Sequence, residues 1–131
     1  MGSFSDHWED EILDHLFGKG TYTPPTIYVG LSTADPGDDG SGLSEPSGNG
    51  YTRAQTAPAD WNSAAAGSLA NAGLIEFNEA TGPWGTATHF ALFDSASGGN
   101  LLAHGALTQA KTVTVGDTAR FTAGDLNLTL D

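Results

Sequence analysis

The sequence predicts a mainly β protein: a single antiparallel β-sandwich of jelly-roll type, with about eight strands and one short N-terminal α-helix. Apolar residues recur every four positions before Gly20 and every second position after it, a change that separates helix from strand. Turn signals rich in glycine and proline then divide the strand-like segments at the short spacing that is typical of sandwiches. Because 131 residues fit one domain, we assign residues 1–20 to an N-terminal helix arm and residues 21–131 to the β-sandwich of that domain.

The helix is expected at about residues 6–17. Ser5 or Asp6 can cap its first turn, where further acidic side chains meet the positive end of the helix dipole. Leu13 and Phe17 widen an apolar stripe that is formed by Trp8, Ile12 and Leu16. Such a stripe either covers the sandwich or contacts a neighbouring chain, and both interpretations stay open.

Eight later segments are expected as strands because they alternate or are continuously apolar: residues 26–33, 51–56, 74–77, 86–93, 101–107, 112–115, 119–122 and 125–130. The segment 86–93 is apolar on both faces at its end, so we place it centrally. Residues 112–115 and 119–122 are expected to form a hairpin about Gly116 and Asp117. Residues 34–50 form a loop that is long for a compact domain, which indicates a surface excursion with a function or with mobility.

The composition is strongly acidic. Its 16 acidic residues against 4 basic ones give a formal net charge of −12, which disfavours nucleic acid and membranes as partners. The chain has no cysteine, so disulfides, thiolate metal sites and cysteine nucleophiles are excluded. The sequence shows neither a signal peptide nor an apolar run of the ~18 residues that would span a bilayer. We therefore expect a soluble protein made in the cytoplasm.

Large apolar residues are scarce. Leucine, isoleucine, valine and phenylalanine make up roughly a fifth of the chain, which together with the high charge approaches the composition of disordered proteins. The clear periodicity of these residues favours a folded domain with a thin core instead. Because burial between chains can supplement a thin core, we expect a homo-oligomer.

The acidic loop 35–40 is a candidate metal site, because clustered carboxylates supply oxygen ligands to calcium. Asp35 and Asp39 match an EF-hand, but Gly37 cannot ligate and Pro46 stands where the bidentate glutamate is required. We therefore interpret the loop as a solvated turn and expect no metal and no cofactor.

His89 and His104 lie on consecutive predicted strands and could face each other across a hairpin whose turn falls at residues 95–100. Two imidazoles at that spacing begin a metal site, so a metal-dependent enzyme centred on them is one alternative function. No third ligand can be assigned, and histidines satisfied in or beside the core are the preferred interpretation. We expect no catalytic residue.

Two tryptophans that follow the helix, Trp61 and Trp84, are candidates for surface recognition, because an exposed aromatic ring can stack on a pyranose ring. The preferred alternative is that they are core or interface anchors, since aromatic side chains dominate the energetics of both.

Four blocks of the sequence resemble small phage proteins that are labelled tail-fibre or virion structural proteins: Ile27–Gly37 (IYVGLSTADPG), Gly50–Arg53 (GYTR), Trp84–Asp94 (WGTATHFALFD) and Gly99–Thr108 (GNLLAHGALT). The resemblance extends from the N-terminal helix to the last leucine-rich strand. It implies a non-enzymatic virion structural protein and carries no catalytic residues with it. It is less specific for the position in the particle, because the chain has no fibrous repeat and no coiled-coil heptads.

Two positions in the virion are weighed. The preferred one is an oligomeric capsid decoration or cement protein, by analogy a homotrimer, which binds the major capsid protein. The acidic charge favours it by preventing adhesion to DNA and to free copies. The alternative is a tail-fibre or tail-associated attachment component that binds other tail proteins and host surface carbohydrate through Trp61 or Trp84, which the long loop 34–50 favours. In both cases the protein is made in the host bacterial cytoplasm and ends in the virion, with Trp8, Ile12 and Leu16 as its expected interface.

Overall fold

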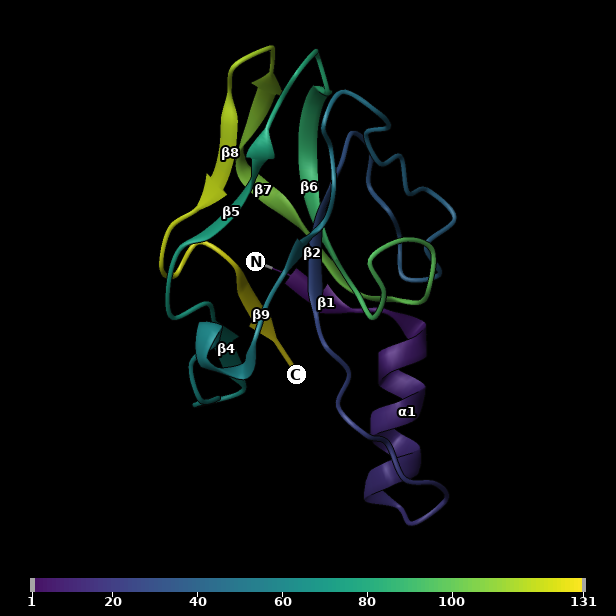
Figure 1. Cartoon of the computed structure of the whole chain (residues 1–131). Coiled ribbons are helices and arrows are strands. Elements are labelled where there is room, and N and C mark those ends of the chain that lie inside the picture. The colour runs from purple at the N-terminus through teal and green to yellow at the C-terminus, as the bar shows by residue number, and fades with distance from the viewer. Residues whose placement is uncertain (1, 131) are drawn as a thin grey trace.

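The computed structural model describes residues 2–130, which form nine strands, one α-helix and one short 3-10 helix (Figure 1). In chain order the elements are β1 (Gly2–Phe4), α1 (Asp6–Leu16), β2 (Tyr28–Ser32), β3 (Ala54–Gln55), η1 (Pro58–Asp60), β4 (Ser68–Ala70), β5 (Ile75–Glu79), β6 (Gly85–Phe93), β7 (Leu101–Val113), β8 (Thr118–Phe121) and β9 (Asn127–Thr129). The prediction of a mainly β protein with one helix near its start is confirmed.

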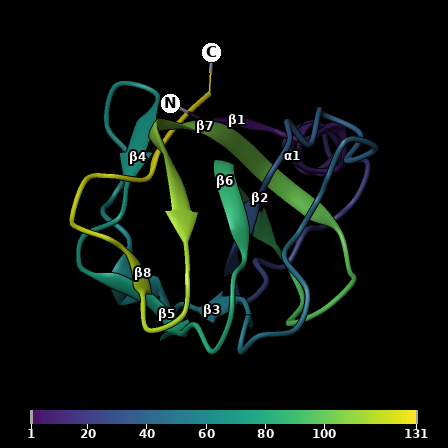
Figure 2. The same cartoon turned by 90° about the horizontal axis from the view of Figure 1, so that it is seen from above.

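Seven strands form one sheet in the order β3-β2-β6-β7-β1-β9-β4, and β5 pairs with β8 in a second, two-stranded sheet. Neighbours in the larger sheet are antiparallel except β1 and β9, which run parallel. Seen from above, the larger sheet curls (Figure 2). The fold is therefore a curled mixed sheet with a small second sheet, and the predicted antiparallel jelly-roll sandwich is not confirmed.

The parallel pair arises because β1, which precedes the helix, inserts between β7 and β9. Gly2 permits this close approach, since a Cβ there would lie 2.6 Å from the Phe90 ring and 2.8 Å from the Leu128 side chain. A strand of three residues cannot display a period of two, so the apolar pattern does not predict it.

Strands β6 and β7 form the hairpin that the sequence predicts about residues 95–100. Their register shifts between the pairs Ala87–Lys111 and His89–Ala106, and β7 continues beyond this bulge to Val113. The predicted hairpin between residues 112–115 and 119–122 is therefore wrong. The backbone of Val113 is already paired with β6, and β8 pairs with β5 instead.

The core lies between the larger sheet and the two-stranded sheet. Its aliphatic part includes Val29, Leu31, Leu92, Leu102 and Leu126, each at most 3% exposed. Its aromatic part forms a chain of ring contacts, from Tyr51 through Trp84 and Phe77 to Phe121, with centroid distances of 5.1 to 6.3 Å. Because aromatic side chains bury about 150–250 Å² each, they compensate for the small number of aliphatic residues.

Residues 34–50, which we name the covering loop, lie over the opposite face of the larger sheet. Pro36 is buried, and the backbone N–H of Thr33 donates to the Ser44 carbonyl over 2.8 Å. Between these two positions, the Asp38 carboxylate lies 2.8 Å from His104 Nε2 on β7. The loop lies on the surface, as expected, and it is folded onto the sheet, so that it closes one face of this thin protein.

Helix α1 begins where the sequence predicts, with the Ser5 hydroxyl as its N-cap acceptor for the Trp8 N–H at 3.3 Å. It projects away from the sheets toward its C-terminal end (Figure 1). Only the start of the apolar stripe is covered, because Trp8 and Ile12 are half-buried while Leu16 is 70% exposed. Among residues 2–130 no helix combines the length and the apolar character that a membrane crossing requires.

Candidate binding groove

An open apolar groove of about 620 Å³ lies between the start of α1, the chain leading into β2, and strands β4 and β9. Its walls are mostly aromatic, proline and aliphatic side chains: Phe4, Trp8, Pro24, Pro25, Ile27, Pro58, Trp61, Leu69, Leu92, Leu128 and Leu130. The remaining lining residues are small or carry hydroxyl or amide groups, and none is charged. The groove is therefore suited to an apolar occupant.

Two tryptophans from distant parts of the chain meet in this groove. Trp8 packs on Phe4 with ring centroids 4.8 Å apart, and its Nε1 donates to the Tyr22 hydroxyl over 2.9 Å. Trp61 Nε1 donates to Thr56 Oγ1 over 3.0 Å. Because the polar atom of each indole is satisfied within the fold, the rings offer the groove their apolar surface.

The other residues that the sequence singles out lie elsewhere. Ile12 is half-buried one turn beyond Trp8, and Leu16 lies on the exposed end of the helix. Trp84 is only 6% exposed in the core, and its Nε1 donates to the Asn49 carbonyl over 2.8 Å. A buried ring offers no face to a ligand, so the recognition hypothesis for Trp84 is corrected to a core anchor, because Tyr51 and Phe77 enclose it.

The two histidines do not face each other across the β6–β7 hairpin, and the pairing that the sequence suggested for them is wrong. The register pairs His89 with Ala106 and His104 with Ala91. His89 Nδ1 lies 2.8 Å from Thr88 Oγ1, whereas His104 lies between the carboxylates of the covering loop. No group of three or more potential metal ligands is found among residues 2–130.

Two carboxylates of the acidic loop accept local hydrogen bonds. Asp35 Oδ1 accepts from the Gly37 N–H over 3.0 Å, and Asp39 Oδ1 accepts from the Ser41 N–H over 2.9 Å. The latter bond is the main reason that the pKa of Asp39 lies below its ordinary value. Carboxylates that accept from the backbone two residues ahead are typical of turns, which agrees with the interpretation of this loop as a turn.

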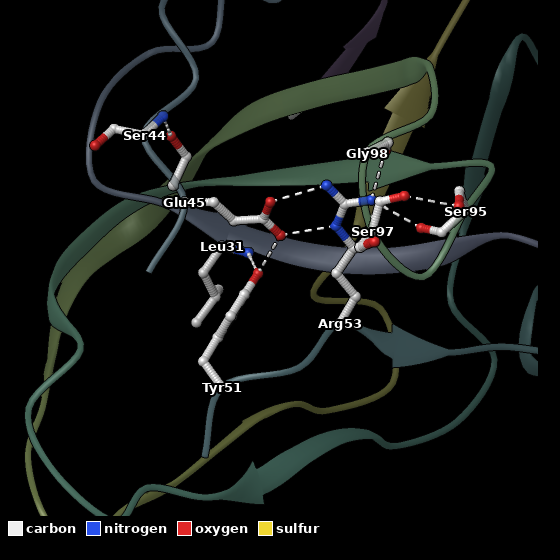
Figure 3. A network of polar contacts seen from close by, with 9 residues as sticks. Leu31, Ser44, Glu45, Tyr51, Arg53, Ser95, Ser97 and Gly98 are labelled. Atoms are coloured by element: carbon white, nitrogen blue, oxygen red, sulfur yellow. Dashed lines mark hydrogen bonds and ion pairs between the residues drawn. The ribbon is translucent and has the colours of Figure 1, made fainter. Parts of the chain in front are cut away.

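A polar network that the sequence does not single out fixes the covering loop to the sheet (Figure 3). Arg53 is almost fully buried and binds both carboxylate oxygens of Glu45 at 2.8 Å. It also donates to the carbonyls of Ser95 and Gly98, and its guanidinium lies 3.4 Å from the centroid of the Phe93 ring. One side chain thereby joins two loops and the sheet.

The same network depends on a glycine and a tyrosine. A Cβ on Gly30 would lie 2.9 Å from the Phe93 ring and from the Tyr51 hydroxyl, so no larger residue fits beneath the network. The Tyr51 hydroxyl donates to Glu45 Oε2 over 2.7 Å and accepts from the Leu31 N–H over 3.0 Å. Tyr51 and Arg53 belong to the block Gly50–Arg53, one of the four blocks that resemble phage proteins. The block marks these residues in the sequence, but it does not indicate that they form a buried network.

Tyr51 gives this network a measurable dependence on alkaline pH. Burial, and then the hydrogen bond to Glu45, raise the pKa of Tyr51 well above its ordinary value. Below about pH 10 both folded and unfolded chains keep the proton, so Tyr51 adds no pH dependence to stability there. Above about pH 10 the Tyr51 hydroxyl loses its proton only in the unfolded chain, so the free energy of unfolding is expected to fall as pH rises.

Urea unfolding between neutral and alkaline pH checks this expectation, with Tyr51→Phe as the comparison. The variant is expected to lose about 1–2 kcal/mol at neutral pH, because the Leu31 N–H loses its acceptor. It is also expected to show a shallower alkaline decline than the wild type. Equal declines in the two proteins would show that Tyr51 ionises normally in the folded chain.

Residues 3–129 match the family described as Podophage GP4 fiber I protein gp80. No curated protein matches the chain. The matched range includes the helix, both sheets, the covering loop and nearly all of the groove lining.

Proposed function

The chain belongs to the podophage GP4 fiber I protein gp80 family, and from this premise we propose that it is a non-enzymatic structural subunit of a podophage tail fibre. It is a phage fibre protein and a virion component, as the family match over residues 3–129 indicates. That match is the observation that carries the proposal. The match favours the tail-fibre alternative over capsid decoration, because the description of the family names a fibre protein.

The polar clusters support a structural role. His104 and Asp38 join β7 to the covering loop, and the Asp38 carbonyl also accepts from the Asp6 N–H at the start of α1. Arg53 and Glu45 join the same loop to the turn between β6 and β7. Each of these groups is engaged in holding loops on a thin core, which is the use expected in a subunit that must keep its shape in a particle.

The groove supports contact with protein more than with carbohydrate. A sugar presents several hydroxyl groups, each of which needs a hydrogen-bond partner when it leaves water. The hydroxyl of Thr56 in the groove wall already accepts from Trp61 and donates to the Ile27 carbonyl. Aromatic and proline walls without charge match the apolar centre of a protein interface, so we assign the groove to assembly.

The position in the particle is testable on purified virions. Quantitative mass spectrometry is expected to give a few dozen copies at most, as for a symmetric tail assembly. Antibody-gold labelling of the same particles is expected at the tail. Hundreds of copies, with gold over the head, would refute the tail-fibre assignment in favour of capsid decoration.

A further inference from the structure

The covering loop ends in a tight turn whose two central residues are Asn49 and Gly50. Their φ angles are 55° and 81°, and the Tyr51 N–H donates to the Gly48 carbonyl over 3.0 Å. Positive φ at both central positions is the mark of a type I′ turn, for which asparagine followed by glycine is a preferred pair. Of the six asparagines in the chain, Asn49 is the only one that a glycine follows.

The turn leaves two groups that can react with each other open to water. Asn49 and Gly50 are both exposed, and the Gly50 N–H donates to no backbone carbonyl within residues 2–130. Glycine also has no side chain that could shield this nitrogen. The Asn49 amide is held by one hydrogen bond, from Nδ2 to the Pro83 carbonyl over 2.9 Å. A nucleophile and an electrophilic carbon on adjacent residues react as parts of one molecule, which removes the entropic cost of bringing them together.

We propose that Asn49 is a site of spontaneous deamidation, and that the reaction loosens the end of the covering loop. The Gly50 nitrogen attacks Asn49 Cγ, so that a new C–N bond closes a five-membered succinimide. The bond from Cγ to Nδ2 breaks, and ammonia leaves with the proton that the Gly50 nitrogen has lost. Water then opens the succinimide at either of its carbonyls, which gives aspartate or isoaspartate. This reactivity does not depend on the fibre role.

Both products lack the side-chain donor that the folded turn uses. The Pro83 carbonyl loses the Nδ2 group of Asn49, and an ionised carboxylate, which can only accept hydrogen bonds, takes its place. Isoaspartate also adds a methylene group to the main chain before Gly50, so the hydrogen bond that closes the turn no longer fits. Because Tyr51 directly follows this turn and anchors the loop through its hydroxyl, a displaced turn weakens the attachment of the loop.

Asn78 is an internal control with similar surroundings. It is exposed like Asn49, and its Nδ2 makes one hydrogen bond of 2.8 Å, to Thr52 Oγ1. The residue after it is Glu79, and both lie in strand β5. A side chain on the following residue shields the nitrogen that would attack, and the strand holds the backbone extended. Asn78 is therefore expected to remain intact where Asn49 reacts.

Peptide mapping by mass spectrometry tests the proposal on the purified full chain, stored for several weeks at mildly alkaline pH. The peptide that contains Asn49 is expected to gain the mass of an amide converted to an acid several-fold faster than the peptide that contains Asn78. The variant Asn49→Gly keeps a residue that adopts positive φ and is expected to abolish the modification.

Urea unfolding of the same samples measures the effect on the covering loop. Stored wild type is expected to unfold at a lower urea concentration than fresh wild type. The midpoint of Asn49→Gly is expected to stay the same during storage. Asn49→Asp carries one of the two products from the start, so it is expected to unfold at a lower urea concentration than the wild type even when fresh.

Two results would overturn the reaction at Asn49. One is an intact Asn49 after a storage time that deamidates a free peptide of residues 47–51, because the folded turn would then protect the side chain. The other is an equal rate at Asn49 and Asn78. Modified protein that unfolds at the same urea concentration as fresh protein would refute the loosening of the covering loop. None of these measurements uses virions, so the fibre assignment is tested separately.

Discussion

Replacing Arg53 with alanine is expected to lower the free energy of unfolding by about 3–5 kcal/mol, the usual effect of removing one partner from a buried ion pair. Only 5% of the Arg53 side chain is exposed, and Glu45 is left with 20% exposure and without its bidentate partner. The carbonyls of Ser95 and Gly98 lose their donor, and the Phe93 ring loses the guanidinium above it. A loss of this size is a large share of the total free energy of unfolding of a domain.

The matched control is Arg120→Ala. Arg120 and Glu76 form a 3.4 Å pair whose side chains are 53% and 46% exposed, and such surface pairs contribute at most about 1 kcal/mol. Urea unfolding of both variants at one pH measures the difference directly. If Arg53→Ala cost no more than Arg120→Ala, the network of Figure 3 would not hold the covering loop in solution.

Asn71→Ala is expected to cost about 3 kcal/mol or more, because it leaves several buried backbone groups without partners. Asn71 is fully buried, and its amide donates to the Gly73 and Thr122 carbonyls over 2.8 and 2.9 Å. Its side-chain oxygen accepts from the Leu126 N–H over 2.9 Å. This one side chain therefore fixes the turn before β5 to the segment that joins β8 to β9.

Asn78→Ala provides the comparison, since Asn78 is exposed and makes one hydrogen bond, to Thr52 Oγ1. It is expected to change stability by less than about 0.5 kcal/mol, as is usual at exposed positions. Asn71→Asp should be as damaging as Asn71→Ala, because a carboxylate cannot donate to the two carbonyls. A tolerated Asn71→Asp variant would mean that the carbonyls find water and that the site opens.

The sequence by itself determined those features whose signals are local. Ser5 and the four-residue spacing after it predicted α1, because a cap and an apolar face act within a few turns. The glycine-rich turn at residues 95–100 predicted the β6–β7 hairpin, since adjacent strands joined by a short turn pair with each other. The mainly β class followed from the same kind of pattern.

Tertiary structure alone decided which distant segments meet. Strand β8 pairs with β5 and not with β7, the strand before it in the sequence, because β7 is paired with β6. No local sequence pattern predicts which of these pairings forms. The sequence predicted the loop 34–50 as a surface excursion but not its attachment to the sheet, because that attachment depends on Arg53 and His104, which lie on other segments. Trp8 and Trp61 are far apart in the sequence and meet in one groove, whose lining also includes Phe4 of β1. Local propensity acts over a few residues. These pairings depend instead on burial and hydrogen bonding between distant segments, so they are visible only in the folded structure.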